Sequence, residues 1–430
     1  MKILGIETSC DETAISIIET EGKIGESFDI KILANEILSQ IALHKEYGGV
    51  FPMLAKREHS KNLMPLLLKA LKESGFLKLK IKSSKSKIEE NLSTYELKNL
   101  QTLLGREPEL LEQFEKEIPK IEKPPLMAIA VTKGPGLEPA LWTGINFAKA
   151  LSAIWNIPLI PINHMEGHIF AGLLQKCEPL ITNHQSLVTD VMSYKLSVIS
   201  FPVIALLVSG GHTELIEMKD WFDYKILGAT RDDAVGEAFD KVARILGLPY
   251  PGGPEISNLA ETARLKELRI MNYELRKESE TEKIKLPRPM IHSGDFDFSF
   301  SGIKTAVLYL VKKLPELTDE IKAEIAREFE DAVVEVLTEK TRRTISETCA
   351  QTLIVGGGVA ANKLLRKKLT EMAGEEGADI FISEISHSTD NALMIAVAGA
   401  THYANFGKES FDNSNFKATG GLKIDNADLF

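Results

Sequence analysis

The sequence contains few cysteines, no long apolar run and no excess of positive charge. No apolar run approaches the roughly 20 residues that a membrane-spanning helix needs, and the N-terminal MKILGIETSCDET lacks the longer apolar core and cleavage site of a secretory signal. Cys10, Cys177 and Cys349 are scattered without a CxxC pair, which is typical of a reducing cytosol and excludes a thiolate metal site. The net charge of −10 argues against nonspecific nucleic-acid binding by the whole surface, but not against a local basic patch or a basic partner. We therefore expect a cytoplasmic protein without a membrane segment.

The length of 430 residues exceeds one ordinary core, so we expect about two domains plus insertions. Strands alternate with helical segments, which predicts an α/β architecture. Residues 3–7 and 14–19 are expected to form two strands around a polar turn. Residues 203–208 and 213–218 repeat this pattern around a glycine-rich turn. The repeat predicts two duplicated lobes with a cleft between them.

The repeat also suggests domain boundaries. We expect an N-terminal lobe over residues 1–200 and a C-terminal nucleotide-binding lobe over residues 201–390. A C-terminal helix and tail, residues 391–430, should pack back on the N-terminal lobe.

Three segments look inserted into these lobes. Residues 78–123 are rich in Lys, Glu and Ser and contain two patches of possible helix. Residues 175–200 are polar and irregular, and residues 261–286 carry dense mixed charge that is typical of a solvated helix. The lysines of 78–123 could contact the phosphates of a nucleic acid, although a solvated, disordered loop is the simpler interpretation.

A candidate metal site combines HMEGH (164–168) with STDN (388–391). Residues four apart share a helix face, so His164 and His168 can bind one ion. Two neutral imidazoles and the carboxylate of Asp390 form a divalent-metal set that leaves coordination positions open. Spacing alone more often marks surface or core histidines, so the assignment depends on the rest of the chain. Because the histidines come from the first half and Asp390 from the second, we expect the metal to hold the lobes together.

The same helix invites comparison with a metallopeptidase. That chemistry needs a glutamate beside the first histidine (HExxH) or the second (HxxEH). Met165 and Gly167 fill these two positions here. Glu166 lies two residues from each histidine, about 200° around the helix, and points away from the metal. The geometry excludes the peptidase.

Two polar turns could bind a nucleotide. The turn SCDET (9–13) contains Asp11 and Glu12, and by itself it could be an ordinary hairpin. It could also present amides to phosphate oxygens and an acid to a cation or nucleophile. The turn LVSGGHT (207–213) lacks the acids but has paired glycines that let the backbone approach a ligand. Two such turns at equivalent places in the halves favour a phosphate clamp.

Other polar motifs have structural and functional interpretations. The segment GGGVAAN (356–362) could be a packing turn or the platform for an adenine or ribose. Asp232 and Asp233 suit helix capping, whereas Asp240 lies deeper in the same helix and needs another role, such as binding a ribose hydroxyl. Lys304 could meet phosphate, or its segment could be core aromatics and a helix cap.

These motifs together resemble the universal family that makes threonylcarbamoyl-adenosine in tRNA, the TsaD type, formerly called the O-sialoglycoprotein endopeptidase family. The matching segments are GIETSCDETAISI, HKEYGGVFPMLAKREH, GPGLEPAL, NHMEGH, LLVSGGHTEL, DDAVGEAFDKVARILGLPYPGGP, FDFSFSGIKTAV, REFEDAVV, GGGVAANKLLR and STDNALMIA. They follow the family order and span nearly the whole chain apart from the three insertions. The resemblance implies an actin-like (ASKHA) α/β fold with two RNase H-like lobes.

The resemblance also implies a metal-dependent acyltransferase. Such enzymes transfer the threonylcarbamoyl group from threonylcarbamoyl-AMP to adenosine-37 of tRNAs that read codons beginning with A. His164, His168 and Asp390 match the ligands of one divalent metal per subunit, with Fe²⁺ favoured and Zn²⁺ possible. Asp11 and Glu12 match acids of the family's active site. The positions that match adenylate-binding residues are Leu207, Val208, Ser209, Gly210, Gly211, Asp240, Gly253 and Asn362.

Members of bacterial type act with an inert paralogous subunit of the same fold and a small P-loop ATPase, and we expect both partners here besides tRNA. The segment VTKGPGLEPALWTG departs from the family pattern at Lys133, Glu138 and Pro139. An ATPase or small-molecule kinase of the same fold is the alternative, and it would leave the metal set unexplained. A noncatalytic scaffold would not need an intact metal and nucleotide set.

Overall fold

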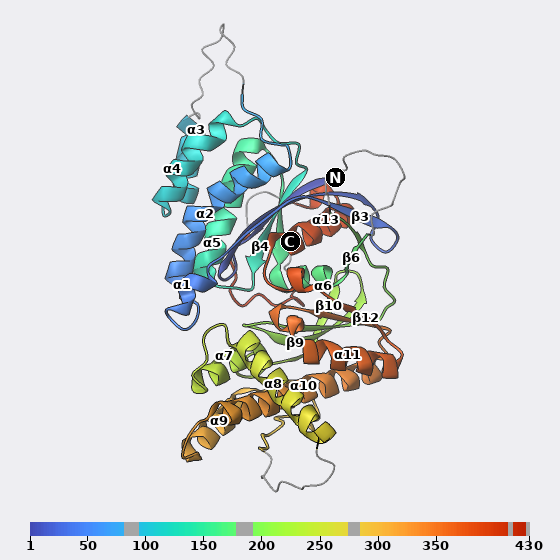
Figure 1. Ribbon diagram of the computed structural model, residues 1–430. Coiled ribbons are helices and arrows are strands. Elements are labelled where there is room, and N and C mark those ends of the chain that lie inside the picture. The colour runs from blue at the N-terminus through green and yellow to red at the C-terminus, as the bar shows by residue number, and fades with distance from the viewer. Residues whose placement is uncertain (81–93, 178–191, 274–283, 412–415, 427–430) are drawn as a thin grey trace, which may run out of the picture. The chain divides into compact units, whose positions relative to one another are not determined.

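The computed structural model describes residues 1–80, 94–177, 192–273, 284–411 and 416–426. The chain divides into two compact units: unit 1 is Met1–Val198 with Thr389–Phe430, and unit 2 is Ile199–Ser388. Figure 1 shows their helices and strands. Among the described residues, no helix has both the length and the apolar character that a membrane span requires.

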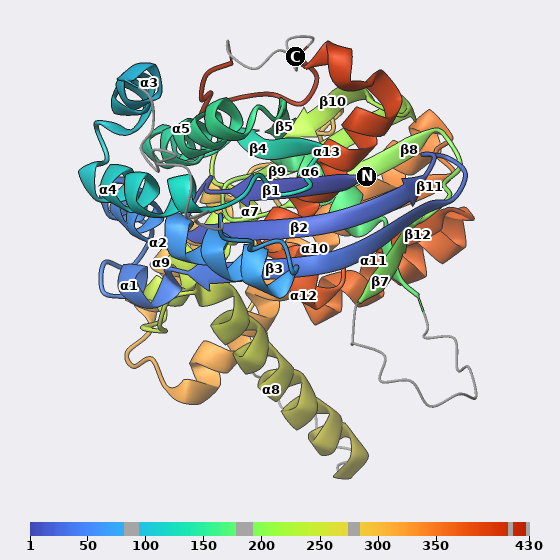
Figure 2. The same cartoon turned by 90° about the horizontal axis from the view of Figure 1, so that it is seen from above.

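Unit 1 is built on a mixed sheet with the strand order β5-β4-β1-β2-β3-β7-β6 (Figure 2). Its strands are β1 (Lys2–Glu7), β2 (Glu12–Gly22), β3 (Phe28–Ser39), β4 (Ala128–Gly134), β5 (Leu159–Asn163), β6 (Leu174–Lys176) and β7 (Ser193–Leu196). Strand β1 pairs antiparallel with β2 and parallel with β4, and β4 pairs parallel with β5. Strand β5 is buried throughout and β4 at all but one residue, which explains their nearly continuous apolar sequences.

Helices cover both faces of the unit 1 sheet. They are α1 (Ile41–Lys45), α2 (Pro52–Glu73), α3 (Thr94–Leu104), α4 (Pro108–Glu117), η1 (Ile118–Lys120), α5 (Glu138–Trp155), α6 (His164–Gly172), α13 (Ala392–Phe406) and η3 (Lys408–Ser410). In β1, Leu4 and Ile6 join a core cluster with residues of α2 and α5. The intervening Gly5 faces α13, where an added Cβ would lie 2.8 Å from the Cβ of Ala396. The two-residue period of the strand therefore sends α2 and α5 to one face and α13 to the other.

Unit 2 is built on a mixed sheet with the order β10-β9-β8-β11-β12. Its strands are β8 (Val203–Val208), β9 (Thr213–Asp220), β10 (Asp223–Ala229), β11 (Thr352–Gly356) and β12 (Asp379–Ile382). Its helices are α7 (Val235–Ile245), α8 (Gly252–Tyr273), α9 (Ser301–Lys313), α10 (Asp319–Thr348), η2 (Gly358–Ala361), α11 (Lys363–Glu376) and α12 (Ile385–Ser388). One apolar core joins strands β8 and β11 to helices α7 to α11, and it includes the edge-to-face pair Phe239 and Phe329.

The two sheets repeat one topology. The order β10-β9-β8-β11-β12 in unit 2 matches β3-β2-β1-β4-β5 in unit 1, with the same antiparallel and parallel senses. This is the RNase H-like strand order expected for lobes of an actin-like fold. The predicted duplication of an α/β unit is therefore confirmed.

The expected insertions differ in character. Within 78–123, both patches of possible helix are confirmed as α3 and α4, but α4 is not part of a solvated loop. Its Leu110, Leu111 and Phe114 are buried in the unit 1 core. Lys82, Lys85 and Lys87 lie outside the described residues.

The other two insertions are partly regular. The ends of the segment 175–200, predicted as irregular, form the antiparallel pair β6 and β7 at the sheet edge. In the segment 261–286, the expected helix is confirmed as far as Tyr273, where α8 ends. Residues 178–191 and 274–283 lie outside the described part of the chain.

Candidate active site

Two capped helices position the three metal-ligand candidates in unit 1. Helix α6 begins at His164, and the side chain of Asn163 before it accepts a hydrogen bond from the Met165 amide at 2.9 Å. Asp390 directly precedes Asn391, whose side chain caps α13 by accepting from the Met394 amide at 3.0 Å. The candidate ligands are therefore held at the starts of two helices that pack on each other.

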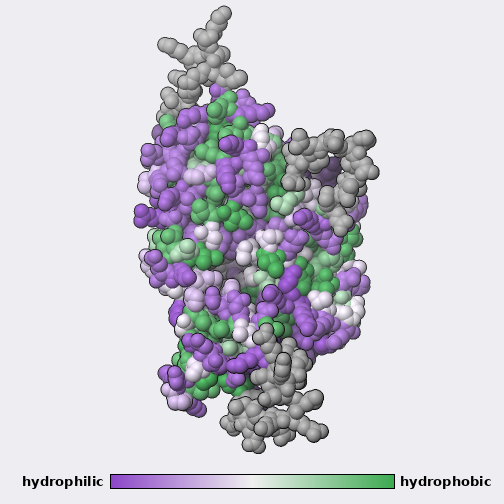
Figure 3. Space-filling view, in the orientation of Figure 1, coloured by the Kyte–Doolittle hydropathy of each residue, from purple (hydrophilic) through white to green (hydrophobic). Residues whose placement is uncertain are grey.

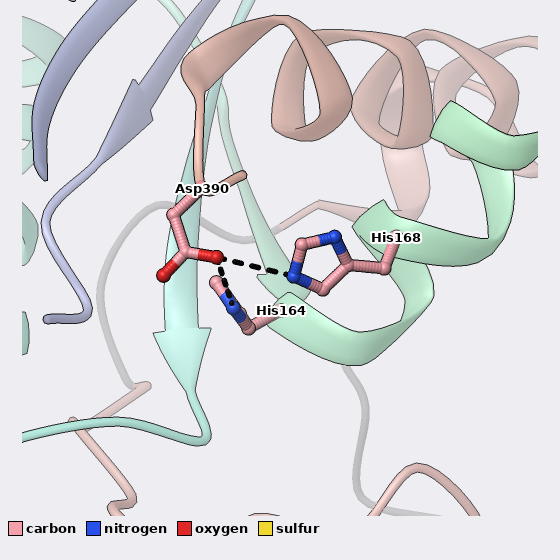
Figure 4. A group of neighbouring side chains, drawn as sticks. All are labelled: His164, His168 and Asp390. Carbon is pink, nitrogen blue, oxygen red and sulfur yellow. Dashed lines mark hydrogen bonds and ion pairs between the residues drawn. The ribbon is translucent and has the colours of Figure 1, made fainter. Parts of the chain in front are cut away.

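His164, His168 and Asp390 converge (Figure 4). Asp390 Oδ1 lies 3.3 Å from His164 Nε2 and 3.2 Å from His168 Nε2. One ligand atom from each residue lies within 4.8 Å of the others. Ligand atoms about 2.1 Å from a common metal would lie about 3.0–3.4 Å apart in octahedral or tetrahedral geometry. The spacing of the two nitrogens from the oxygen fits a divalent ion.

The other nitrogen of His164 faces a buried carboxylate. Its Nδ1 lies 3.2 Å from Glu7 Oε2, and Glu7 is fully buried at the end of β1. A carboxylate only accepts, so Nδ1 carries the proton and Nε2 points toward Asp390. Thr132 Oγ and the Ser9 amide also donate to Glu7, which fixes its orientation. For His168, Nδ1 is buried without a hydrogen-bond partner among the described residues.

The carboxylates and imidazoles at the metal-ligand candidates shift one another's pKa. Burial alone would raise the pKa of Asp390, but His164 and His168 hold it well below its ordinary value. Burial alone would lower the pKa of His164, but Asp390 and Glu7 raise it well above its ordinary value. Burial would also raise the pKa of Glu7, and His164 lowers it instead. One buried and one half-buried carboxylate around one imidazole form a strong site for positive charge.

The position of Asp390 corrects one expectation. We expected Asp390 to belong to the C-terminal lobe and the metal to hold the lobes together. Thr389–Phe430 belongs to unit 1, so all three candidate ligands come from that unit. The reason is that Asp390 begins the segment that leads into α13, which packs on β1, β2, β4 and β5.

Glu166 confirms the argument against a peptidase. Its Oε2 lies 2.8 Å from His402 Nε2 of α13, and both side chains are buried. This pair joins α6 to α13, so the glutamate serves packing and does not face the metal candidates.

Asp11 lies in the turn before β2, Glu12 is the first residue of β2, and the charge of Asp390 acts on both carboxyl groups. Burial, and then the charges of Asp11 and Asp390, raise the pKa of Glu12 to about 10. Burial also raises the pKa of Asp11. Glu12 accepts a hydrogen bond from Ser39 Oγ at 3.1 Å. Glu12 is therefore protonated near neutral pH, beside a second acid whose burial also disfavours its charged form.

In unit 2, the LVSGG turn joins β8 to β9. Ser209 Oγ accepts from the amides of Gly211 and His212 at 3.3 and 3.1 Å, which closes the turn. A Cβ added to Gly210 or Gly211 would meet nothing within 4 Å, so both glycines face open space. Leu207 and Val208 are buried strand residues that hold the turn in place.

The second glycine-rich turn lies beside the first. Gly356 of β11 pairs with Leu207 of β8, so both strands end at one edge of the sheet. Gly357 has a φ of +89°, and a Cβ there would lie 2.4 Å from the Val208 carbonyl oxygen. Only glycine permits this approach. The structure therefore brings the residues 207–211 and 356–362 together, as a shared nucleotide site requires.

Asp240 contacts the start of α8, where Gly253 is the second residue. Asp240 Oδ1 accepts from the Gly252 amide at 2.7 Å, so this carboxylate ties α7 to the first residues of α8. A Cβ added to Gly253 would meet nothing within 4 Å. We expected Asp240 to bind a ribose hydroxyl because it lies too deep in α7 to cap that helix. The cap that it provides belongs to α8.

Asn362 also has protein partners. Its Oδ1 accepts from the Leu365 amide at 2.9 Å and caps α11. Its Nδ2 donates to Ser257 Oγ at 3.0 Å and to Glu330 Oε1 at 2.6 Å. Both amide hydrogens are therefore used within unit 2, and only oxygen lone-pair capacity remains for a ligand.

Two predicted caps need correction. Asp232 does not cap α7, which begins after Ala234 without a side-chain cap. It accepts from the Phe300 and Ser301 amides and caps α9, across 68 and 69 residues of sequence. Asp233 lies 2.7 Å from Lys241 and 3.7 Å from Lys304, so Lys304 faces a carboxylate.

Comparison with known proteins identifies the family. The family model described as TsaD: tRNA N6-adenosine threonylcarbamoyltransferase matches residues 31–83 and 108–397. A protein of that name from Nitrosospira multiformis is 39% identical over 93% of this chain and 90% of its own length. One from Burkholderia ambifaria is 37% identical over 100% of this chain and 99% of its own length.

The chain belongs to this family. A relative of the same name from Chromobacterium violaceum is 38% identical over 93% of this chain and 92% of its own. Solved structures are more distant: a ROK hexokinase from Thermus thermophilus is 10% identical, with a TM-score of 0.40 over 93% of this chain and 97% of its own. The relatives carry the name of a transferase, and not of the ATPase or kinase that we considered as the alternative.

The family match assigns fewer residues to the insertion in 78–123 than the composition did. The TsaD match resumes at residue 108, where α4 begins, and omits residues 84–107 with α3. The matched part contains His164, His168 and Asp390. Sequence reasoning missed Glu7, whose signal was only an acid at the end of an otherwise apolar strand.

Proposed function

We propose that this chain is a metal-dependent tRNA N6-adenosine threonylcarbamoyltransferase. It transfers the threonylcarbamoyl group from threonylcarbamoyl-AMP to the exocyclic amine of adenosine-37, in tRNAs that read codons beginning with A. The observation that carries the proposal is a convergent His164, His168 and Asp390 set in a chain related to such transferases along its whole length. A kinase of this fold would have no use for that set.

The donor set supports one divalent ion held by His164, His168 and Asp390. Two imidazoles and one carboxylate with open positions suit Fe²⁺, and they also suit Zn²⁺. When bound, such an ion supplies Lewis-acid chemistry at the carbamoyl or threonyl oxygens of the donor. Glu7 keeps the proton of His164 on Nδ1, which leaves Nε2 to bind the ion.

The acidic turn supports the proton transfer. The exocyclic amine is a weak nucleophile because its lone pair is delocalised into the ring, so the donor must be an activated anhydride. The amine nitrogen forms a bond to the carbamoyl carbon, the bond from that carbon to the phosphate oxygen breaks, and AMP leaves. Asp11 accepts the amine proton, and the protonated Glu12 donates a hydrogen bond. A pKa raised by burial suits Asp11 to this work.

Unit 2 supports binding of the adenylate. The open space at Gly210 and Gly211 lets a phosphate approach the backbone of the turn 207–211. The turn 356–362 beside it suits the adenosine. Asp240, Gly253 and Asn362 shape this surface through the contacts that fix the starts of α8 and α11.

The substrate also implies partners and a compartment. A chain with a net charge of −10 supports a composite tRNA-binding surface, so we propose an inert paralogous subunit and a small P-loop ATPase as partners. Because the substrate is tRNA, we place the enzyme in the cytoplasm.

One assay tests the transferase. The chain is incubated with threonine, bicarbonate, ATP and tRNA, with and without the adenylate-forming enzyme and accessory subunits. We expect threonylcarbamoyl-adenosine only when threonylcarbamoyl-AMP is made. His164→Ala should lose both bound metal and transfer. Phosphorylation of a small molecule without modified nucleoside would support the kinase instead, and full transfer by a metal-free variant would remove the metal from the proposal.

A further inference from the structure

An exposed aromatic pair lies between α1 and α2 in unit 1. Tyr47 is 64% exposed and Phe51 is 52% exposed. Their rings stack with centroids 5.9 Å apart and planes 21° apart. Figure 3 shows hydrophobic and hydrophilic residues interspersed on the face of unit 1 that it presents. Two ordered aromatic rings that remain in solvent point to a ligand that stacks.

Buried His44 holds the pair in place. Its carbonyl oxygen accepts from the amides of Tyr47 and Gly49 at 3.0 and 3.3 Å. Its Nδ1 accepts from the Phe51 amide at 3.3 Å. Gly48 and Gly49 have φ of +66° and +152°, so the short turn between the rings depends on glycine.

A chain of hydrogen bonds continues from His44 to the acidic turn. Because His44 Nδ1 accepts, its Nε2 carries the proton and donates to Gln40 Oε1 at 3.2 Å. Gln40 Nε2 then donates to His59 Nδ1 at 3.3 Å. His59 Nε2 donates to the Cys10 carbonyl at 3.1 Å, and burial lowers the pKa of His59 to about 4, which keeps it neutral.

The backbone supports the same connection. The Gln40 amide donates to the Asp11 carbonyl oxygen at 2.9 Å. Thr13 Oγ1, in the acidic turn, lies 2.8 Å from the same His59 nitrogen and shares it with Gln40, so the aromatic turn and the acidic turn form one hydrogen-bonded assembly. A ligand that stacks on the rings is thereby held in register with Asp11.

The charges around the pair suit nucleic acid. Lys45 and Arg57 are exposed on either side of the turn, and Lys61 is exposed one helical turn beyond Arg57 on α2. Glu46 is the exposed acid among them. Exposed basic residues that flank exposed aromatic rings in the sequence, in a chain of net charge −10, are typical of sites that stack single-stranded bases beside a phosphate backbone.

We propose that Tyr47 and Phe51 form a platform on which an unstacked base of the tRNA anticodon loop stacks, next to the adenosine that is modified. The inference rests on the proposed function and adds a recognition site to it. Modification of a base amine requires that the loop be splayed, and a neighbouring base then loses its own stacking partner. The platform replaces that partner.

The test compares three substitutions at Tyr47. Tyr47→Ala removes the ring, Tyr47→Leu keeps apolar surface without the ring, and Tyr47→Trp keeps stacking. Tyr309→Ala is the control because Tyr309 is 60% exposed on α9, in unit 2. We measure KM for tRNA and kcat under conditions in which the wild-type chain transfers. We also measure the affinity for an anticodon stem–loop without donor.

We expect Tyr47→Ala and Tyr47→Leu to raise KM and the stem–loop Kd about tenfold, the fold-change for about 1.4 kcal/mol, with kcat and bound metal unchanged. Tyr47→Trp and Tyr309→Ala should match the wild type. Tyr47→Leu at wild-type affinity would overturn the platform, because apolar surface alone would suffice. So would a Tyr47→Ala defect confined to binding of an accessory protein.

The binding measurement and the transfer measurement together distinguish this inference from the proposed function. A chain that binds the stem–loop through Tyr47 but transfers nothing supports the platform and contradicts the transferase. A chain that transfers normally while Tyr47→Ala keeps the wild-type KM and Kd contradicts the platform alone.

Discussion

The role of Glu7 gives the sharpest test of the candidate metal centre. Replacing Glu7 by Gln keeps the shape of a fully buried side chain and removes its charge. One of its oxygens becomes an NH₂ group that can only donate. At the Oε2 position this group would face His164 Nδ1, and the neutral ring could then accept only by moving its proton to Nε2. At the Oε1 position it would face the Ser9 amide, which is also a donor.

Both orientations weaken metal binding by His164. In the first, the nitrogen that faces Asp390 at 3.3 Å carries a proton and has no lone pair for a metal. In the second, two donors oppose each other at the Ser9 amide, and His164 Nδ1 donates to a neutral amide oxygen in place of a carboxylate, which makes the ring a less basic ligand. Loss of such a partner typically costs 10- to 100-fold in metal affinity. We therefore expect Glu7→Gln to weaken metal binding by about 1.4–2.7 kcal/mol.

A matched variant is available on the metal helix itself. Glu166 is equally buried and also contacts a histidine, His402, but it faces away from His164 and His168. Titration calorimetry of the metal-free protein with Zn²⁺ should give a Kd for Glu166→Gln within about twofold of the wild type, as for a substitution away from the site. Wild-type affinity in Glu7→Gln, or an equal loss in both variants, would refute the reasoning.

Three further predictions concern protons and packing. Because the pKa of His164 is raised above 6.5 in the folded chain, a proton must leave when the ring binds metal. Metal affinity should rise with pH, by up to about tenfold per unit, and proton release in calorimetry checks this. In the metal-free fold, His164 should contribute its full stabilisation below pH 6.5 and lose it as the pH rises through the raised pKa, which urea unfolding checks. Phe114→Ala should cost about 3–5 kcal/mol in urea unfolding because its ring is buried edge-on to Phe147, whereas Leu97→Ala, 40% exposed on α3, should change stability by less than about 0.5 kcal/mol. Asp11→Asn should lower single-turnover transfer by about 10²- to 10⁴-fold with metal retained, and an unchanged rate would end its assignment as the base.

The duplicated fold could be predicted because it follows from the local periodicity of apolar residues. Two strands around a polar turn begin each half, and a two-residue or continuous apolar pattern marks a strand wherever it occurs. The metal candidates could be predicted for a similar reason, since HxxxH places two rings on one helix face. The helical parts of the charged segment 78–123 also followed from pattern.

Long-range polar contacts could not be predicted. The cap of α9 comes from Asp232, 68 residues before Phe300, and no local rule connects them. The sequence shows Glu7 only as the end of a strand, and its contact with His164, 157 residues later, appears only in the structure. Asp390 was assigned to the wrong unit because sequence position alone does not say on which sheet the next helix packs.

The hydrogen bonds of the polar residues in unit 2 bear on how the proposed adenylate would be recognised there. Asp240 ties α7 to α8, and both amide hydrogens of Asn362 are donated to Ser257 and Glu330. A ligand acceptor could use the amide hydrogens of Asn362 only by breaking hydrogen bonds that are already made, at about 1 kcal/mol or more each, and a ligand donor would have to share oxygens that already accept. The backbone of the turn is open to a ligand at Gly210 and Gly211, because nothing lies within 4 Å of the space where their side chains would be, and the Gly211 amide is held in place by its hydrogen bond to Ser209 Oγ. Recognition by backbone, with side chains that fix its shape, is therefore the arrangement that these contacts favour.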